Sequence, residues 1–419
     1  MSTLLIRRFQ TDWASWLAVA FIALLPFRRL SEIPLSIFAI SLAFLAKSPA
    51  NRARIAQASK FILPLFLCYW IPMLISSFDS VYPEKSWSTS IAALRYLAAA
   101  LAMSVLLAQP SARERVLRWT AWLLLFWAVD AFVQLFFGRD VFGIAMHPDR
   151  LNALFIKNYQ FFGPTLAMLS PLVLEHARRQ WRPWAWAVSF ALILGAVMIA
   201  GMRAGWLTMG LVLITYMILM LRPENRELRQ TMLTIPVLSV IVLTGAYFAS
   251  PLFQERVDVI RAVTVDTGSA LDESTMERIP IFKAALKMYR EHPVNGVGVR
   301  AFPVAYMEYA EPDDVHIRKS GGKTGGRHAH NLVLEIMSDT GTIGLLGLLL
   351  AIAFLWKSRG TITPTEWRDA FPFALAVFLI LFPFNSHFAI YGTYTSSLVW
   401  FLMGLWGASI RSSNAGSPP

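Results

Sequence analysis

The chain contains a long succession of apolar runs, and this feature restricts the folds open to it more than any other. A helix needs roughly 20 apolar residues to cross the hydrocarbon core of a bilayer, where only helices and closed barrels satisfy their own backbone polar groups. Runs near that length lie at about 12–27, 33–46, 61–78, 86–108, 117–137, 159–175, 184–201, 205–221, 231–250, 331–356, 370–384 and 391–410. We therefore predict an all-α, polytopic integral membrane protein with about 12 transmembrane helices. The number falls to ten or eleven if the short run 33–46 and the proline-interrupted run 370–384 do not span.

The composition agrees with a surface that faces lipid. Hydrophobic residues make up 56% of the chain and charged residues 15%, whereas soluble proteins carry about 25% charged residues. The net charge of +12 could indicate a nucleic-acid partner, but the basic residues lie in short pieces between apolar runs and not on one polar domain. The single cysteine, Cys68, excludes an intrachain disulfide and a Cys-based zinc site. The first run lacks a small-residue cleavage site and is expected to remain as an anchor.

The distribution of lysine and arginine predicts the orientation, because short cytoplasmic loops retain these residues. With the N-terminus inside, the short inner connections hold 19 of them and the short outer ones hold 7. Both termini are therefore expected in the cytoplasm. The predicted organisation is transmembrane helices 1–9 in residues 1–250, a large periplasmic loop domain in 251–330, helices 10–12 in 331–410, and a cytoplasmic tail in 411–419.

The large outer loop is predicted to contain an amphipathic helix. Residues 274–277 read Ser-Thr-Met-Glu, a capping box that predicts a helix over about 275–290, ended by Pro293. On that helix Arg278 falls in the middle of the apolar face, opposite Lys283, Lys287 and Arg290. Arg278 can cover apolar surface or pair with a neighbouring acid, or its guanidinium can face a cleft, where it suits phosphate oxygens.

Two further groups lie at predicted outer ends of spans. Arg203 follows Gly201 in a tight turn at a helix start, a setting that binds anions, although an arginine there can equally contact lipid headgroups. His330 directly precedes the run 331–356, where a histidine can exchange protons near neutral pH. Residues expected to accompany it in binding substrate are Lys323, Arg327, His328, Asn331 and, from another outer loop, His387. No Cys/His set completes a metal site, so neither metal nor cofactor is predicted.

Arg95 and Asp130 are ionisable residues inside predicted spans. Such residues cost roughly 2.5–3.5 kcal/mol on insertion scales and are functional candidates by default. An ion pair between them that joins two helices is the interpretation we favour, and Arg95 is also a candidate for substrate binding.

A bipartite motif in the outer loop and the following span resembles one known family. Its first part is His292-Pro293 with Gly296, Gly298 and Phe302. Its second part is His330-Asn331, followed nine residues later by Gly341-Thr342-Ile343-Gly344. In a multispan chain with one large outer loop, this pattern resembles the O-antigen ligase and O-antigen polymerase superfamily.

The resemblance implies a metal-independent, inverting glycosyltransferase of GT-C-like architecture in the bacterial inner membrane. It implies a glycan donor linked to undecaprenyl pyrophosphate and, for a ligase in lipopolysaccharide biosynthesis, a sugar hydroxyl of lipid A–core oligosaccharide as the acceptor. The family's essential histidine corresponds to His330, and its two arginines correspond most naturally to Arg203 and Arg278. The residue types suit this chemistry, because a diphosphate leaving group needs cations and the acceptor needs a base.

Other functions remain open. An O-antigen polymerase or a protein O-oligosaccharyltransferase would share the motif, and the single dominant outer loop favours the ligase. A transporter or flippase for lipid-linked glycan is the alternative of another class. Such proteins place their sites near the membrane midplane, whereas the polar residues here gather at the outer end. The sequence predicts no nucleic-acid partner, and the oligomeric state, including a monomer, stays open.

Overall fold

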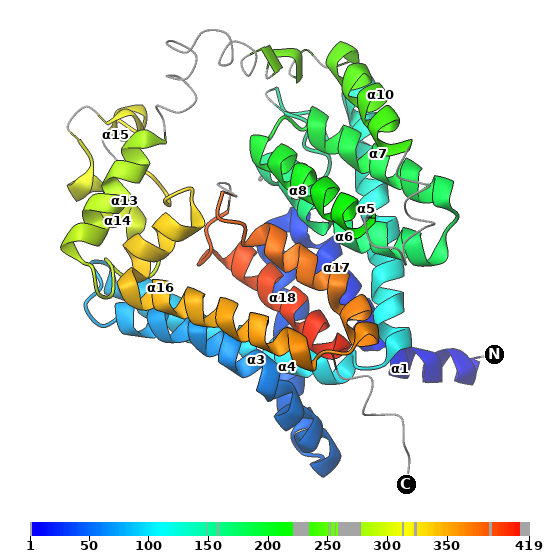
Figure 1. The fold of residues 1–419 in the computed structure, drawn as a ribbon, viewed down its shortest axis with the longest axis horizontal. Helices are drawn as coiled ribbons and strands as arrows, with labels where there is room; N and C mark the ends of the chain where they lie inside the picture. Colours follow the sequence, from blue (N-terminus) through cyan, green and yellow to red (C-terminus); the bar gives the residue numbers. More distant parts are fainter. Residues whose placement is uncertain are drawn as a thin grey trace. The chain divides into compact units, whose positions relative to one another are not determined.

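The helical prediction is confirmed. The computed structural model describes residues 2–148, 150–156, 159–220, 234–249, 251, 253–255, 257–258, 278–311, 314–321, 325–384 and 388–410. Within these residues the regular structure is helical, apart from isolated bridges that join Arg139 to Ala145 and His147 to Arg150. The helices, shown in Figure 1, are α1 (Ser2–Ala23), α2 (Glu32–Leu45), α3 (Pro49–Ser76), α4 (Pro83–Leu106), α5 (Pro110–Phe137), α6 (Phe162–Gln180), α7 (Pro183–Ile199), α8 (Arg203–Met220), α10 (Thr234–Ala249), α13 (Ile279–Glu291), α14 (Phe302–Tyr309), α15 (Val315–Lys319), α16 (Leu332–Ser358), α17 (Pro364–Ile380) and α18 (Thr393–Ser409).

Each of the twelve predicted apolar runs coincides with one of these helices. Among the described residues, four helices, α3, α4, α5 and α16, are long and apolar enough to cross a membrane, and shorter apolar helices lie within α1, α7, α8 and α10. These helices indicate a membrane protein, while the count of twelve spans stays a prediction. Several helices begin at a proline, including Pro49, Pro83, Pro110 and Pro183. Proline suits this position because its ring presets the helical φ and the first N–H has no helical partner.

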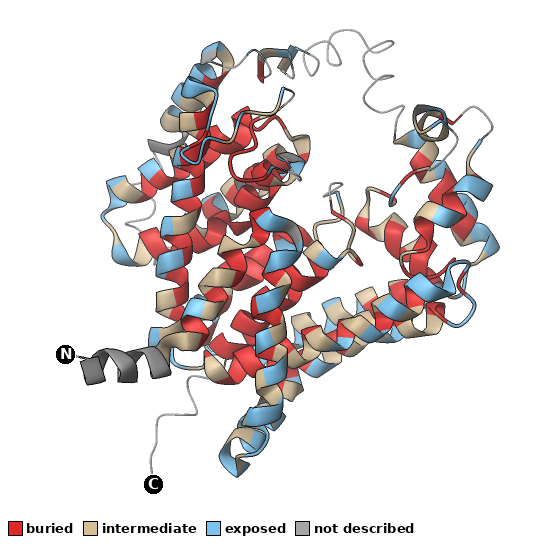
Figure 2. Ribbon diagram, turned by 180° about the vertical axis from the view of Figure 1, so that it is seen from behind, coloured by how far each residue is buried: buried red, intermediate tan, exposed pale blue. Residues whose placement is uncertain are grey.

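The chain forms two compact units. Unit 1 comprises residues 1–34, 109–261 and 371–379. At its centre lies α6, which packs against α5, α7 and α8 and is buried from Phe162 to Ala177; buried residues are drawn red in Figure 2. A helix that is apolar on every side must be enclosed by others, so α6 forms the core of this unit.

Unit 2 comprises residues 35–108, 262–370 and 380–419. In it α3 packs against α4 and α16, and α18 packs against α4; α16 and α3 run alongside each other in Figure 1. Gly347 of α16 faces the Cys68 carbonyl so closely that a Cβ atom would overlap it. The absence of a side chain at Gly347 therefore allows the two helix backbones to approach.

The described part of the outer loop builds a small core of its own within unit 2. Buried side chains of α13 and α14 share one cluster, which consists of Ile281, Ala284, Ala285, Met288, Val297, Ala301, Phe302, Ala305, Tyr306, Tyr309 and Ala329. The Tyr306 hydroxyl donates to an Asp314 carboxylate oxygen at 2.8 Å. Burial and this carboxylate raise the pKa of Tyr306 above its ordinary value, so the phenol remains a proton donor.

The predicted amphipathic helix exists, with one correction. It ends at Glu291, before Pro293 as expected, and Lys283, Lys287 and Arg290 are exposed. The predicted capping box at 274–277 lies outside the described residues. Arg278 occupies the N-cap of α13 and not the middle of its buried face. The reason is Pro280, which fits only the first turn of a helix and so sets the start at Ile279.

Candidate functional site

The site in unit 2 begins with a break in α16. Gly341 has φ 63° and ψ −157° inside this helix, so backbone groups on both sides of it lose their helical partners. Buried backbone groups require hydrogen bonds, and segment 293–298 supplies them. Four bonds join the two segments: Val297 N to Ser338 O (2.8 Å), Gly298 N to Asp339 O (3.2 Å), Thr342 N to Pro293 O (2.8 Å) and Ile343 N to Val294 O (3.1 Å).

Two glycines make this pairing possible. A Cβ on Gly296 would overlap the backbone at Ser338 and Asp339, and a Cβ on Gly341 would overlap the backbone at Val294. Both glycines also have positive φ values, which other residues rarely adopt. The two halves of the sequence motif are therefore partners in one main-chain contact, which explains why glycine stands at these positions in both.

Residues 297–299 also form hydrogen bonds with the region where α3 ends and α4 begins. Val81 N donates to Val297 O (3.0 Å), Val299 N donates to Ser76 Oγ (3.1 Å), and Ser86 Oγ donates to Val299 O (2.8 Å). Residues 293–299 therefore connect α16 with the ends of α3 and α4. Arg300, the next residue, has little backbone freedom left.

Arg300 is held in an unusual conformation by a buried acid. Its φ is 63°, a region that non-glycine residues rarely occupy. The Arg300 N–H donates to Asp339 Oδ2 at 2.9 Å. Such backbone strain persists only where the surroundings enforce it, and it concentrates at functional sites.

Two carboxylates support this arrangement from within α16. Glu335 and Asp339 lie one turn apart and are only 2% and 1% exposed. Glu335 accepts hydrogen bonds from the backbone N–H groups of Ile390 and Tyr391, while Asp339 holds Arg300. The acids therefore connect the Arg300 turn to the segment before α18. Sequence reasoning missed all three residues, although two acids four residues apart in an apolar run are a recognisable signal.

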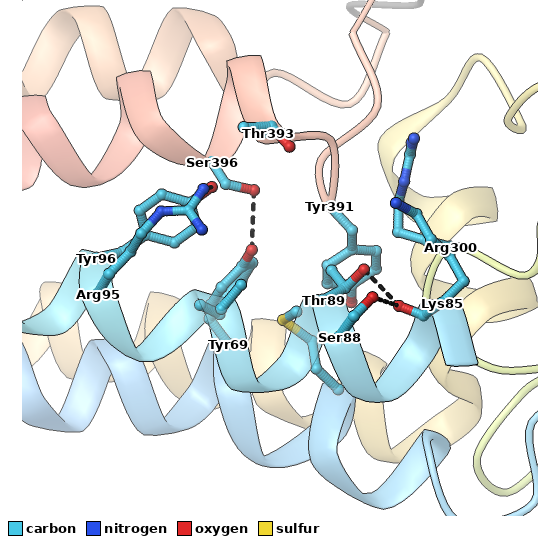
Figure 3. Close-up of a pocket in the computed structure, with 13 residues that line it drawn as sticks. Tyr69, Lys85, Ser88, Thr89, Arg95, Tyr96, Arg300, Tyr391, Thr393 and Ser396 are labelled. Carbon is cyan, nitrogen blue, oxygen red and sulfur yellow. Dashed lines mark hydrogen bonds between the residues drawn. The ribbon is translucent and has the colours of Figure 1, made fainter. Parts of the chain in front are cut away.

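A cavity of about 220 Å³ opens beside Arg300 (Figure 3). It is lined by Tyr69, Met73, Lys85, Ser88, Thr89, Ala92, Ala93, Arg95, Tyr96, Arg300, Tyr391, Thr393 and Ser396. The Arg95 guanidinium lies over the Tyr96 ring, 4.7 Å from its centroid, and donates to the Tyr96 hydroxyl at 3.1 Å. The Tyr69 hydroxyl bonds Ser396 Oγ at 2.9 Å. Of the predicted site residues, Arg95 is thus placed in a cationic cavity.

His330 lies between the small outer core and the start of α16. Ala329 is buried in that core, and His330 has φ 52°. The His328 and His330 rings are 3.9 Å apart between centroids and inclined at 44°. Asn331 caps α16, because its Oδ1 accepts from Val333 N (3.0 Å) and Leu334 N (3.1 Å). Arg327 is exposed nearby in the chain.

The two predicted arginines belong to different units and are described separately. Arg203 is the first residue of α8 in unit 1 and follows Gly201, whose φ is 71°. Arg150 Nη1 donates to Gly201 O at 3.1 Å, which brings a second guanidinium to the same turn. Arg278 is half-buried at the N-cap of α13 in unit 2. The predicted residues Lys323 and His387 lie outside the described residues.

Asp130 has a local role in unit 1. Its Oδ1 accepts from Val141 N at 2.8 Å, in the loop that follows α5. Arg95 belongs to unit 2, so the predicted ion pair between Arg95 and Asp130 stays a prediction. Over the described ranges, no three His, Cys, Asp or Glu side chains come close enough together to hold a metal ion.

In a comparison with known protein families, residues 188–349 match a family model described as O-antigen ligase. The matched region contains Arg203, Arg278, His330 and both halves of the contact at the α16 break. No curated protein matches the chain.

Proposed function

We propose that this chain is an O-antigen ligase, and the match over residues 188–349 supports its membership of the O-antigen ligase and polymerase superfamily. This family includes glycosyltransferase-like ligases and polymerases, which supports an enzyme that uses a lipid-linked glycan and an acceptor. The proposed donor is a glycan on undecaprenyl pyrophosphate. The proposed acceptor is a sugar hydroxyl of lipid A–core oligosaccharide.

One observation carries the proposal. His330 lies inside the matched region and is held in a left-handed backbone conformation directly before α16. A neutral imidazole at such a position can take a proton near neutral pH. Strained backbone at a residue with this chemistry is typical of an active site.

The reaction needs a base and a way to neutralise the leaving group. In the proposed mechanism a neutral nitrogen of His330 takes the proton of the acceptor hydroxyl. The acceptor oxygen then bonds to the anomeric carbon as the bond to the diphosphate oxygen breaks, with inversion at that carbon. The guanidinium groups of Arg203 and Arg278 neutralise the negative charge that develops on the departing undecaprenyl diphosphate.

The proposed setting is the periplasmic face of the bacterial inner membrane, with both termini in the cytoplasm. The charge distribution of the short loops supports this proposed orientation, in which the start of α16 would lie on the outer side. Because guanidinium groups serve as the cations, transfer is expected to persist in excess chelator. Dependence on an added divalent metal would contradict this part of the mechanism.

The direct test is reconstitution of the full chain with undecaprenyl-pyrophosphate-linked glycan and purified lipid A–core. Glycan on the core oligosaccharide is the expected product. Longer glycan on the carrier, with none on the core, would instead make the chain a polymerase. Glycan that crosses the membrane without any transfer would indicate a flippase.

A further inference from the structure

We propose that the cavity lined by Lys85, Arg95 and Arg300 binds a phosphate or diphosphate group of one of the enzyme's lipid-linked substrates. The inference rests on the proposed function for the identity of those substrates. It adds a binding site to the pair Arg203 and Arg278, and it assigns roles to two residues, Lys85 and Arg300, that the sequence motif does not single out.

The charge of the cavity favours an anion. Three cationic side chains line it, and among the lining residues that the structure describes none carries a carboxylate. The acids Glu335 and Asp339 do not line the cavity; they are buried in α16, where they hold the backbone around Arg300. Arg95, from α4, and Arg300, from the turn before α14, both line this cavity (Figure 3).

One arginine side chain and one arginine backbone are positioned before any ligand arrives. The Arg95 guanidinium is oriented by the ring and the hydroxyl of Tyr96, whereas at Arg300 the backbone is held by its left-handed conformation and its N–H bond to Asp339. The Arg95 guanidinium can therefore bind phosphate oxygens with little further loss of side-chain entropy.

The start of α18 adds a second feature that favours an anion. Thr393, the first residue of this 17-residue helix, lines the cavity, and Gly392 is its N-cap. Arg300 Nη1 lies 3.7 Å from the position that a Cβ on Gly392 would take. The guanidinium therefore lies beside a helix N-terminus, whose N–H groups and dipole attract negative charge.

Size and depth limit the ligand, and charge selects it. About 220 Å³ is less than the roughly 300–1,000 Å³ of sites for whole small molecules, so the cavity holds one part of a lipid-linked substrate, and its cationic lining favours the phosphate part. Lys85 lies in the first turn of α4 and Arg95 lies about 15 Å farther along that helix. A cavity that extends from the end of a membrane helix into it suits the phosphate of a lipid, whose tail remains in the bilayer.

The test measures binding directly, without relying on transfer. Full-length protein in nanodiscs is titrated with undecaprenyl diphosphate and, separately, with lipid A–core. The variants are Lys85→Gln, Arg95→Gln and Arg300→Asn, because asparagine tolerates the left-handed region. Lys287→Gln and Arg290→Gln remove exposed cations of α13 and serve as matched controls.

We expect the dissociation constant of one ligand to rise about tenfold in each cavity variant and to stay within about twofold in the controls. A rise with the carrier identifies the donor diphosphate as the source, and a rise with lipid A–core identifies the acceptor. Unchanged affinity for both ligands in all cavity variants overturns the proposal, as does an equal loss in the controls. Lys85 is exposed, so its variant gives a result even if an arginine variant fails to fold.

The two proposals can fail separately. If the wild type transfers no glycan but the cavity variants weaken binding, the phosphate site stands and the ligase function falls. If the wild type transfers glycan and the cavity variants bind both ligands normally, the function stands and the cavity proposal falls.

Discussion

Two connecting segments, one in each unit, are held by different kinds of hydrogen bond. In unit 1 the loop 138–156 is held by side chains: Gln134 Oε1 accepts from Asn152 N (3.2 Å) and Ala153 N (2.9 Å), and Gln134 Nε2 donates to Ile144 O (3.2 Å). In unit 2 the segment 293–298 is held mainly by main-chain bonds across the break in α16. Side-chain anchors depend on single polar residues, whereas main-chain pairing depends on glycines that let two backbones meet.

The difference bears on function. In unit 1 the buried polar side chains are used to hold a loop, which gives Asp130 a structural role. In unit 2 the main-chain pairing leaves side chains available, and it presents Arg300 to a cavity. The role of an ionisable residue in or near the membrane is therefore better inferred from the groups it contacts than from its presence in an apolar run.

The largest loss of stability is expected when Gly341, at the break in α16, is replaced. Gly341→Ala would place a Cβ against the Val294 backbone at a positive φ, so we predict a loss of about 3 kcal/mol in the free energy of unfolding. Thermal unfolding in detergent measures it. Gly210→Ala is the control, because a Cβ there meets nothing within 4 Å and helix propensity predicts a gain of about 0.5–1 kcal/mol. Equal melting temperatures for Gly341→Ala and the wild type would refute the proposed contact.

The second-largest loss of stability is expected when Asp339, which holds the backbone of Arg300, is replaced. Asp339→Ala removes the buried acceptor of the Arg300 N–H, which should cost about 2 kcal/mol of stability and lower glycan transfer per folded molecule. Asp339→Asn retains an oxygen acceptor and should recover part of both losses. If Asp339→Ala matches the wild type in melting temperature and transfer rate, this carboxylate does not position Arg300.

A smaller effect is expected in unit 1. Gln134→Ala removes three hydrogen bonds to the loop 138–156, so stability should fall by about 1–2 kcal/mol. Transfer per folded molecule should be unchanged, because the loop is anchored structurally. Loss of transfer in protein with normal stability would give this loop a catalytic role and remove the contrast between the units.

The smallest effect is predicted for Asp130→Asn. The amide oxygen can still accept from Val141 N, so the change should cost about 0.5–1 kcal/mol and leave transfer unchanged. Selective loss of transfer would instead support the functional interpretation that an acid within a span first suggests.

Much of the fold could be predicted from the sequence, because its signals are local. Apolar runs and starting prolines indicate the helices, and residue spacing indicates the exposed face of α13. The capping box predicts a start of this helix near residue 275, whereas α13 begins at Ile279, because Pro280 fits only the first turn of a helix.

The site could be predicted only in part. Arg95 and His330 are candidates because of their local sequence setting, whereas the position of Arg300 depends on hydrogen bonds between segments about 40 residues apart. No local pattern reveals that Gly341 interrupts α16, because glycine is tolerated inside many helices. The partner of the break, segment 293–298, becomes visible only when the chain is folded.

One measurement tests most directly whether His330 acts as the base in glycan transfer. Reconstituted His330→Ala is compared with His316→Ala, a histidine of the same outer loop in α15, at equal amounts of folded protein. We predict that His330→Ala lowers transfer to lipid A–core by about 10²–10⁴-fold, while His316→Ala retains it. Transfer at the wild-type rate by His330→Ala would contradict the account.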